Sequence, residues 1–225
     1  MMPIKAVTFD LDGTLLDTLE DIAFSANAVL KELGHPTFDV PEYRYFVGDG
    51  VFVLFQKTLP ESHRDEKTIT ECARLFRDVY QKNPNKKIRP YDGVEALLRA
   101  LTERGIRLAI LSNKPHELAQ NAVKDFLPSS LFDLVLGQRD SIPPKPDPRG
   151  AIEIADHLNL STHHFLYLGD TAVDMQTAVR AEMFPVGVLW GFREKKELEE
   201  NGARIVIDHP LDLLRFMDGD EAFSL

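Results

Sequence analysis

Two aspartates two positions apart, Asp10 and Asp12, follow the short apolar run of residues 6–9. In an extended strand alternate side chains point to the same side, so the two carboxylates lean the same way with their Cα atoms about 6–7 Å apart. Two negative groups held this close together attract a cation or a cationic side chain. The pair is therefore the first candidate for a chemical site.

Further polar side chains follow other apolar runs of the chain. Ser112 and Asn113 come directly after residues 107–111, and Asp170 comes soon after residues 165–168. In an open parallel sheet, ligands bind beyond the carboxyl ends of the strands. Each residue alone could cap a helix or shape a turn, but their joint placement indicates one shared site.

A fourth acid and a lysine complete this candidate set. Asp174 follows Asp170 by four residues, and Lys145 lies in the proline-rich loop of residues 142–148. Two carboxylates 4 Å apart repel each other by about 4 kcal/mol at an effective dielectric constant near 20. A hard divalent cation relieves this repulsion, and an all-oxygen site suits magnesium rather than zinc. With Lys145 as a second positive charge, the set predicts a receptor for a phosphate dianion.

The elements that must position these residues alternate between short apolar runs and helical patterns. Apolar residues spaced i, i+3, i+4 and i+7 predict amphipathic helices from Val94 to Leu101 and from Ala151 to Leu158. The alternation predicts an α/β fold, a Rossmann-like parallel sheet with helices on both faces. The expected strands are residues 6–9, 107–111, 134–136, 165–168, 185–188 and 205–207.

One region breaks this alternation, because it shows helical periodicity without strand patterns. One apolar stripe starts at Leu19 and another starts at Ile69. We therefore expect an all-helical subdomain inserted after the first strand, with linkers that allow it to move. The expected division is an α/β core of residues 1–17 and 90–225, a helical domain of residues 18–89, and linkers at residues 15–18 and 86–90.

The composition is that of an ordinary globular protein with an acidic balance: 225 residues, 44% of them hydrophobic, carry a formal net charge of −10. This charge argues against nucleic acid and anionic membranes as partners, because both reward a basic surface. The single cysteine, Cys72, excludes a disulfide framework. We find no signal-peptide pattern and no apolar run of about 20 residues, so we expect a cytoplasmic protein.

Four segments of the chain, in this order, resemble the four motifs of the haloacid dehalogenase superfamily of phosphohydrolases. The helical insert resembles the small helical cap that this superfamily carries between its first and second motifs. The resemblance implies a magnesium-dependent phosphatase for a small phosphorylated metabolite, acting as a monomer or homodimer. The segments are Asp10-x-Asp12-Gly13-Thr14, Ser112-Asn113, Lys145-Pro146 and Gly169-Asp170-x-x-x-Asp174.

The resemblance also implies a role for each motif residue. Asp10 would attack phosphorus to form an aspartyl-phosphate, and Asp12 would act first as acid and then as base. Asp10, Asp170 and the main-chain carbonyl of Asp12 would hold Mg²⁺. Asp174 would either bind the metal through water or orient the site. Asn113 would shape the site or contact substrate, and the residues assigned to the phosphoryl group are Thr14, Ser112, Asn113 and Lys145.

Relatives with other reactions differ at these positions. Dehalogenases of this superfamily lack the second aspartate, and the transport ATPases carry lysine where Asp12 stands. Phosphonate hydrolases need a cap lysine that forms a Schiff base. Lys31 or Lys57 could be that lysine, so phosphonate hydrolysis stays open as an alternative. A sugar phosphomutase and a non-catalytic phospho-ligand-binding protein also remain as alternatives to a phosphatase.

The segment from Arg44 to Val51 resembles the cap loop of phosphoglycolate phosphatases. Arg44 is a candidate for binding a substrate carboxylate, and Gly48 and Gly50 would allow close approach of the backbone. Asp49 departs from this pattern, because it would lie beside an anionic substrate. A sugar phosphate or another small phosphomonoester therefore stays open as the substrate.

Overall fold

The computed structural model describes residues 3–83 and 87–219. The chain divides into two compact units, Met1–Asp17 with Pro90–Leu225, and Thr18–Arg89. We call them the α/β unit and the helical unit. Lys86, at the start of the second expected linker, lies outside the described residues.

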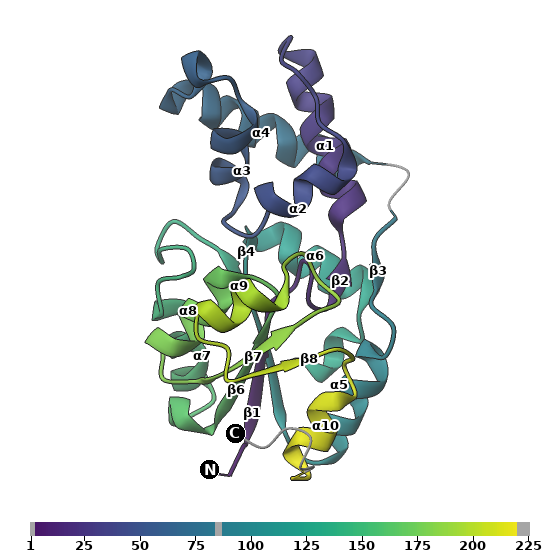
Figure 1. Cartoon of the computed structure of the whole chain (residues 1–225), viewed down its shortest axis with the longest axis vertical. Coiled ribbons are helices and arrows are strands. Elements are labelled where there is room, and N and C mark those ends of the chain that lie inside the picture. The colour runs from purple at the N-terminus through teal and green to yellow at the C-terminus, as the bar shows by residue number, and fades with distance from the viewer. Residues whose placement is uncertain (1–2, 84–86, 220–225) are drawn as a thin grey trace. The chain divides into compact units, whose positions relative to one another are not determined.

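Within the described residues, the α/β unit contains a six-stranded sheet with the order β5-β4-β1-β6-β7-β8 (Figure 1). All neighbouring strands are parallel. β1 lies inside the sheet and is buried along its whole length. The expected fold class is confirmed. The strands are β1 (Ala6–Phe9), β4 (Arg107–Pro115), β5 (Leu134–Gln138), β6 (Phe165–Gly169), β7 (Phe184–Val188) and β8 (Ile205–Ile207).

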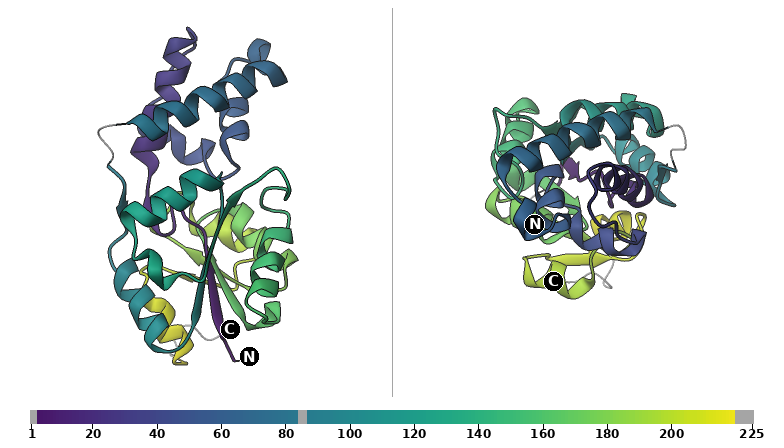
Figure 2. Two further views of the ribbon diagram at one scale, coloured as in Figure 1. Left: turned by 180° about the vertical axis from the view of Figure 1, so that it is seen from behind. Right: turned by 90° about the horizontal axis from the view of Figure 1, so that it is seen from above.

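Helices cover both faces of this sheet (Figures 1 and 2). Because parallel crossovers are right-handed, the steps β1 to β4 to β5 place their helices on one face. The steps from β5 back to β6, β7 and β8 run the other way and place theirs on the opposite face. The first face carries α5 (Val94–Glu103), α6 (His116–Phe126) and α10 (Asp212–Met217), and the second carries α7 (Arg149–His157), α8 (Ala172–Arg180) and α9 (Lys195–Glu200).

The strand β4 is longer than the sequence pattern predicted. Its pairing with β5 shifts register between Leu111 and Pro115, where Pro115 pairs with Gln138. The ladder thus resumes beyond an irregular stretch. Ser112 and Asn113, which we expected after the strand, consequently lie within it.

The helical unit is built around α1 and α4, which pack against each other. Their predicted apolar stripes are buried, including Ala26 of α1 and Cys72 of α4. Leu33, the last residue of the apolar stripe that starts at Leu19, is nevertheless 37% exposed, because α1 ends at Glu32 and Gly34 takes a left-handed turn with φ 74°. The helices are α1 (Leu19–Glu32), α2 (Tyr43–Phe46), α3 (Val51–Thr58) and α4 (Glu66–Lys82).

Short elements connect these helices and strands. Among the described helices, none combines the length and the apolar character needed to cross a lipid bilayer. The remaining elements are a two-stranded sheet of β2 (Leu16–Asp17) and β3 (Arg89–Pro90), and the 3₁₀ turns η1 (Val40–Glu42), η2 (Glu61–His63), η3 (Ser129–Leu131) and η4 (Thr162–His164).

Candidate active site

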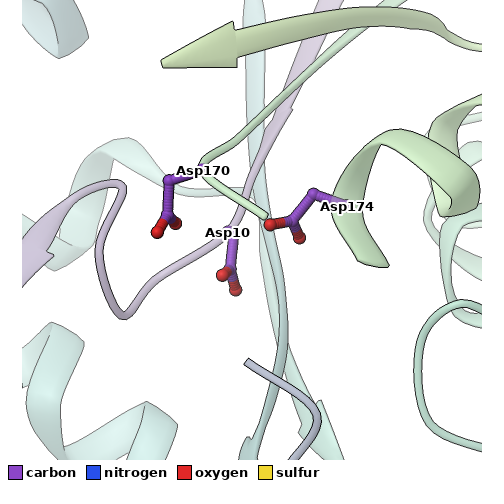
Figure 3. Close-up of side chains that lie close together, drawn as sticks. All are labelled: Asp10, Asp170 and Asp174. Atoms are coloured by element: carbon purple, nitrogen blue, oxygen red, sulfur yellow. The ribbon is translucent and has the colours of Figure 1, made fainter. Parts of the chain in front are cut away.

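Three aspartates from separate segments meet at the carboxyl edge of the sheet (Figure 3). Asp10 follows β1 and Asp170 follows β6. Because these strands pair in register, with Phe9 opposite Leu168, the residues after them leave the sheet side by side. Asp174 lies in the first turn of α8. One carboxylate oxygen of each lies within 4.8 Å of the others, and all three side chains are buried.

The charges of this cluster are poorly balanced. Burial and then the charge of Asp174 raise the pKa of Asp10 to about 7, although Lys145 opposes the rise. Burial also raises the pKa of Asp170 well above its ordinary value, and the two other aspartates add to this effect. Both shifts indicate that three ionised carboxylates need more positive charge. A hard divalent cation such as Mg²⁺ fits this all-oxygen donor set.

These shifts predict that the metal-free protein loses stability as the pH rises. The folded state raises the pKa of Asp10 from 3.8 to about 7. The contribution of Asp10 to the free energy of unfolding is thus fully present below pH 3.8 and is lost as the pH rises through about 7. In EDTA, we expect the Tm of the unchanged protein, measured by thermal denaturation, to fall relative to the Tm of Asp10→Asn over this range. An identical pH dependence in the two proteins would contradict this assignment.

Lys145 is the buried cation of the site. Its Nζ lies 2.8 Å from Asp10 Oδ1 and 2.6 Å from Asp174 Oδ1. Burial alone would lower the pKa of Lys145, but the two carboxylates raise it well above its ordinary value, so the lysine is charged. It compensates part of the negative charge in the cluster.

Asn113 holds the main chain of Lys145. Its Oδ1 accepts a hydrogen bond from the N–H of Lys145 at 2.8 Å, and its Nδ2 donates to the carbonyl oxygen of Lys145 at 3.2 Å. Of the roles left open for Asn113, these contacts support that of shaping the site.

The two hydroxyls assigned to phosphate binding have different surroundings. Ser112 Oγ accepts a hydrogen bond from the N–H of Lys114 at 3.2 Å, which leaves its own hydrogen for donation. Thr14 Oγ1 instead donates to Asp170 Oδ1 at 2.8 Å. The Thr14 hydroxyl therefore positions a carboxylate in this structure, which differs from the phosphate contact we expected.

The segment after β7 supports Asp170 from the other side. The N–H of Phe192 donates to Asp170 Oδ2 at 2.9 Å. A Cβ atom at Gly13 or Gly191 would collide with the Asp170 side chain, and Gly13 also has a φ of 90°. Sequence reasoning assigned no role to Phe192 or Gly191, because neither side chain carries a polar group that would have drawn attention to the site.

Asp174 uses both of its oxygens within the protein. Oδ1 pairs with Lys145, while Oδ2 accepts hydrogen bonds from the N–H of Thr171 at 3.1 Å and from its hydroxyl at 2.7 Å. A side chain at Gly169 would overlap Asp174. Of the two roles left open for Asp174, these contacts support the orienting one.

Asp12 lies outside the cluster of three acids. Its carboxylate pairs with Nζ of Lys114, which lies 3.0 Å from Oδ1 and 3.1 Å from Oδ2. Sequence reasoning did not single out Lys114. A usable signal existed, because Lys114 follows Ser112 by two residues in the strand next to β1.

The residues assigned to substrate selection lie in the helical unit. Arg44 is exposed on α2. Gly48 and Gly50 have φ values of 112° and 89°, a conformation that favours glycine. Asp49 Oδ2 lies 2.8 Å from Nζ of Lys57, so its negative charge is compensated by a side chain of α3.

The chain is similar to known proteins over most of its length. The profile of the haloacid dehalogenase-like hydrolases matches residues 7–188. The chain is 31% identical to a phosphoglycolate phosphatase from Aquifex aeolicus, over 96% of the chain and 97% of the relative. It is 32% identical to a phosphoglycolate phosphatase from Nitrosospira multiformis, over 88% and 89%.

A solved structure shows the same architecture. It belongs to a protein from Lactobacillus delbrueckii subsp. bulgaricus that is provisionally described as a phosphoglycolate phosphatase. The two chains superpose with a TM-score of 0.88 at 30% identity, covering 97% of this chain and 100% of the other. The similarity thus extends over both units.

Proposed function

This chain belongs to the haloacid dehalogenase-like hydrolase family, the family expected from its four motifs, and on that premise we propose that it is a magnesium-dependent phosphatase of small phosphomonoesters. The observation that carries the proposal is the meeting of Asp10, Asp170 and Asp174, with Lys145 in contact with Asp10 and Asp174. Such a site combines an activated nucleophile with positive charge for a phosphoryl group.

The chemistry begins with Asp10. One of its carboxylate oxygens forms a bond to phosphorus, and the bond between phosphorus and the ester oxygen breaks. Asp12 gives its proton to the leaving oxygen, so the alcohol departs neutral. Lys145 and the hydroxyl of Ser112 stabilise the negative charge on the phosphoryl oxygens during this transfer.

The second half of the reaction returns the site to its starting state. Asp12, now ionised, takes a proton from a water molecule that attacks the phosphorus of the aspartyl-phosphate. The bond between phosphorus and Asp10 breaks, and inorganic phosphate leaves. Asp12 is protonated again for the next cycle.

Mg²⁺ would be held by Asp10, Asp170 and the main-chain carbonyl of Asp12. When bound, the ion supplies positive charge that stabilises the phosphoryl oxygens and the crowded carboxylates. Thr14 and Phe192 donate hydrogen bonds to the Asp170 carboxylate, so this group is already oriented before the metal binds.

We assign substrate selection to the helical unit, with Arg44 as partner of a substrate carboxylate and Gly48 and Gly50 as the close-approach positions. The names of the relatives favour phosphoglycolate, which carries both a phosphate and a carboxylate. The pairing of Asp49 with Lys57 supports this assignment, because it compensates the negative charge that would repel such an anion. The partner is thus a small phosphorylated metabolite, and we assign the enzyme to the cytoplasm.

The test is a screen of phosphate esters with the purified protein. We expect release of inorganic phosphate from p-nitrophenyl phosphate and phosphoglycolate with Mg²⁺, loss of this activity in EDTA, and recovery when Mg²⁺ is restored. Equal rates with and without EDTA would contradict the metal assignment. Conversion of a hexose 1-phosphate to its isomer would indicate a mutase, and binding of esters without turnover would indicate a non-catalytic protein.

A further inference from the structure

Lys114 is a buried cation at the site that the reaction described above does not use. Its side chain is only 5% exposed, although a lysine in β4 could be expected to reach solvent. Its ammonium group lies almost equally far from the two oxygens of Asp12, at 3.0 Å and 3.1 Å. A buried ammonium group is tolerated only where its charge is compensated, so this contact is a built feature of the site.

The two buried lysines serve different carboxylates. Lys145 contacts Asp10 and Asp174, on the side of the nucleophile. Lys114 contacts Asp12, the group assigned to proton transfer. Each acid that acts on the substrate therefore has its own cation, supplied from a separate segment of the chain.

The main chain at Lys114 has a second contact in the site. Its N–H donates to Ser112 Oγ, which leaves the Ser112 hydrogen available for a phosphoryl oxygen. This contact does not involve the lysine side chain. Replacing the side chain therefore changes the partner of Asp12 while leaving the Ser112 contact in place.

A carboxylate at the end of a strand needs a partner to stay in one rotamer. Proton transfer to the leaving oxygen requires a separation of about 2.6–3.2 Å between heavy atoms. The 17% exposed side chain of Asp12 follows β1 and precedes Gly13, whose φ of 90° turns the chain. The contact of Lys114 with both oxygens restrains the position of the carboxylate.

We propose that Lys114 is a positioning residue, which holds the Asp12 carboxylate in the orientation required for proton transfer to the leaving oxygen. The inference rests on the proposed function, since it needs Asp12 to act as general acid. It concerns the step in which the ester bond breaks. Its consequence is a dependence on the leaving group: esters with a poor leaving group need Lys114, and esters with a good one do not.

The test compares kcat/KM for three esters in Lys114→Met and the unchanged protein. This ratio reports only the steps up to release of the leaving group. For ethyl phosphate and phosphoglycolate, whose leaving groups need a proton, we expect kcat/KM to fall on the order of 10²-fold. For p-nitrophenyl phosphate, whose leaving group departs without a proton, we expect a fall of less than about threefold.

Two further variants separate positioning from a merely structural role. Lys114→Arg keeps a cation that can contact both carboxylate oxygens, and it should recover most of the lost rate. In an Asp12→Asn background, Lys114→Met should cost little more, because both changes disable the same group. Lys195→Met removes a lysine paired with Glu199 on the surface of α9 and should leave all three rates unchanged.

Several results would overturn the proposal. An equal fall for all three esters would show that Lys114 serves the phosphoryl group or the fold. A fall confined to phosphoglycolate would make it a binding group for the substrate carboxylate. Additive losses in the double variant would show that it acts independently of Asp12. If the unchanged protein turned over none of the esters, the proposed phosphatase function itself would fail instead.

Discussion

Replacing Asp10 by asparagine is expected to reduce phosphatase turnover by on the order of 10⁴-fold or more, because the variant lacks the carboxylate that we propose as the nucleophile. The side-chain amide of asparagine has nearly the same shape, so the position of the cluster should be kept. The measurement is release of inorganic phosphate from phosphoglycolate with saturating Mg²⁺. Quenching the unchanged enzyme in acid during turnover should trap a phosphorylated protein that Asp10→Asn does not give.

The same substitution should not destabilise the protein. Asp10 is buried and its pKa is raised by burial and by Asp174, so its ionised form is disfavoured in the fold. In EDTA near pH 8, we expect the Tm of Asp10→Asn to equal or exceed that of the unchanged protein. Asp78→Asn, which alters an exposed acid paired with Arg74 on α4, provides the control for a general effect of charge. Full activity in Asp10→Asn would remove the basis of the mechanism.

Replacing Lys145 by methionine is expected to damage stability and activity together. The lysine side chain is 3% exposed and lies within 2.8 Å of two buried carboxylates, which the variant leaves uncompensated. Breaking a buried pair in this way costs about 3–5 kcal/mol in the free energy of unfolding. Turnover should fall by roughly 10²–10³-fold as well, because the phosphoryl oxygens lose a fixed cation.

Denaturant unfolding and phosphate release together test this expectation. Addition of Mg²⁺ should restore part of the stability of Lys145→Met, because the ion compensates the same carboxylates, but it should not restore turnover. Lys195→Met again serves as a control, since its ion pair lies on the surface. Unchanged stability in Lys145→Met would show that Asp10 and Asp174 are not jointly ionised in the folded protein.

The parts of the site that sequence predicted are those set by chain direction alone. The carboxyl ends of parallel strands lie at one edge of a sheet, so Asp10 after β1 and Asp170 after β6 could be assigned to one place from the sequence. Asp174 could be assigned to the same place, because it follows Asp170 by only four residues and therefore lies in the first turn of the next helix, α8. These inferences need no knowledge of side-chain rotamers.

Contacts between side chains of neighbouring segments could not be predicted from the sequence. The hydroxyl of Thr14 has two plausible targets, a phosphate and Asp170, and only packing decides between them. The pairing of Lys114 with Asp12 depends on how far β4 continues, and its register shift has no clear mark in the sequence. Composition and spacing therefore predict which acids gather, but not how each is held.

The central place of β1 has a consequence for biosynthesis. β1 is translated well before one of its neighbours in the sheet, β6, which is complete only when residues 165–169 have been translated. Residues 18–89 are contiguous and can form their helices on the ribosome much sooner. Since Lys145 precedes Asp170 and Asp174 in the order of translation, the cation is already available when the last two negative charges arrive.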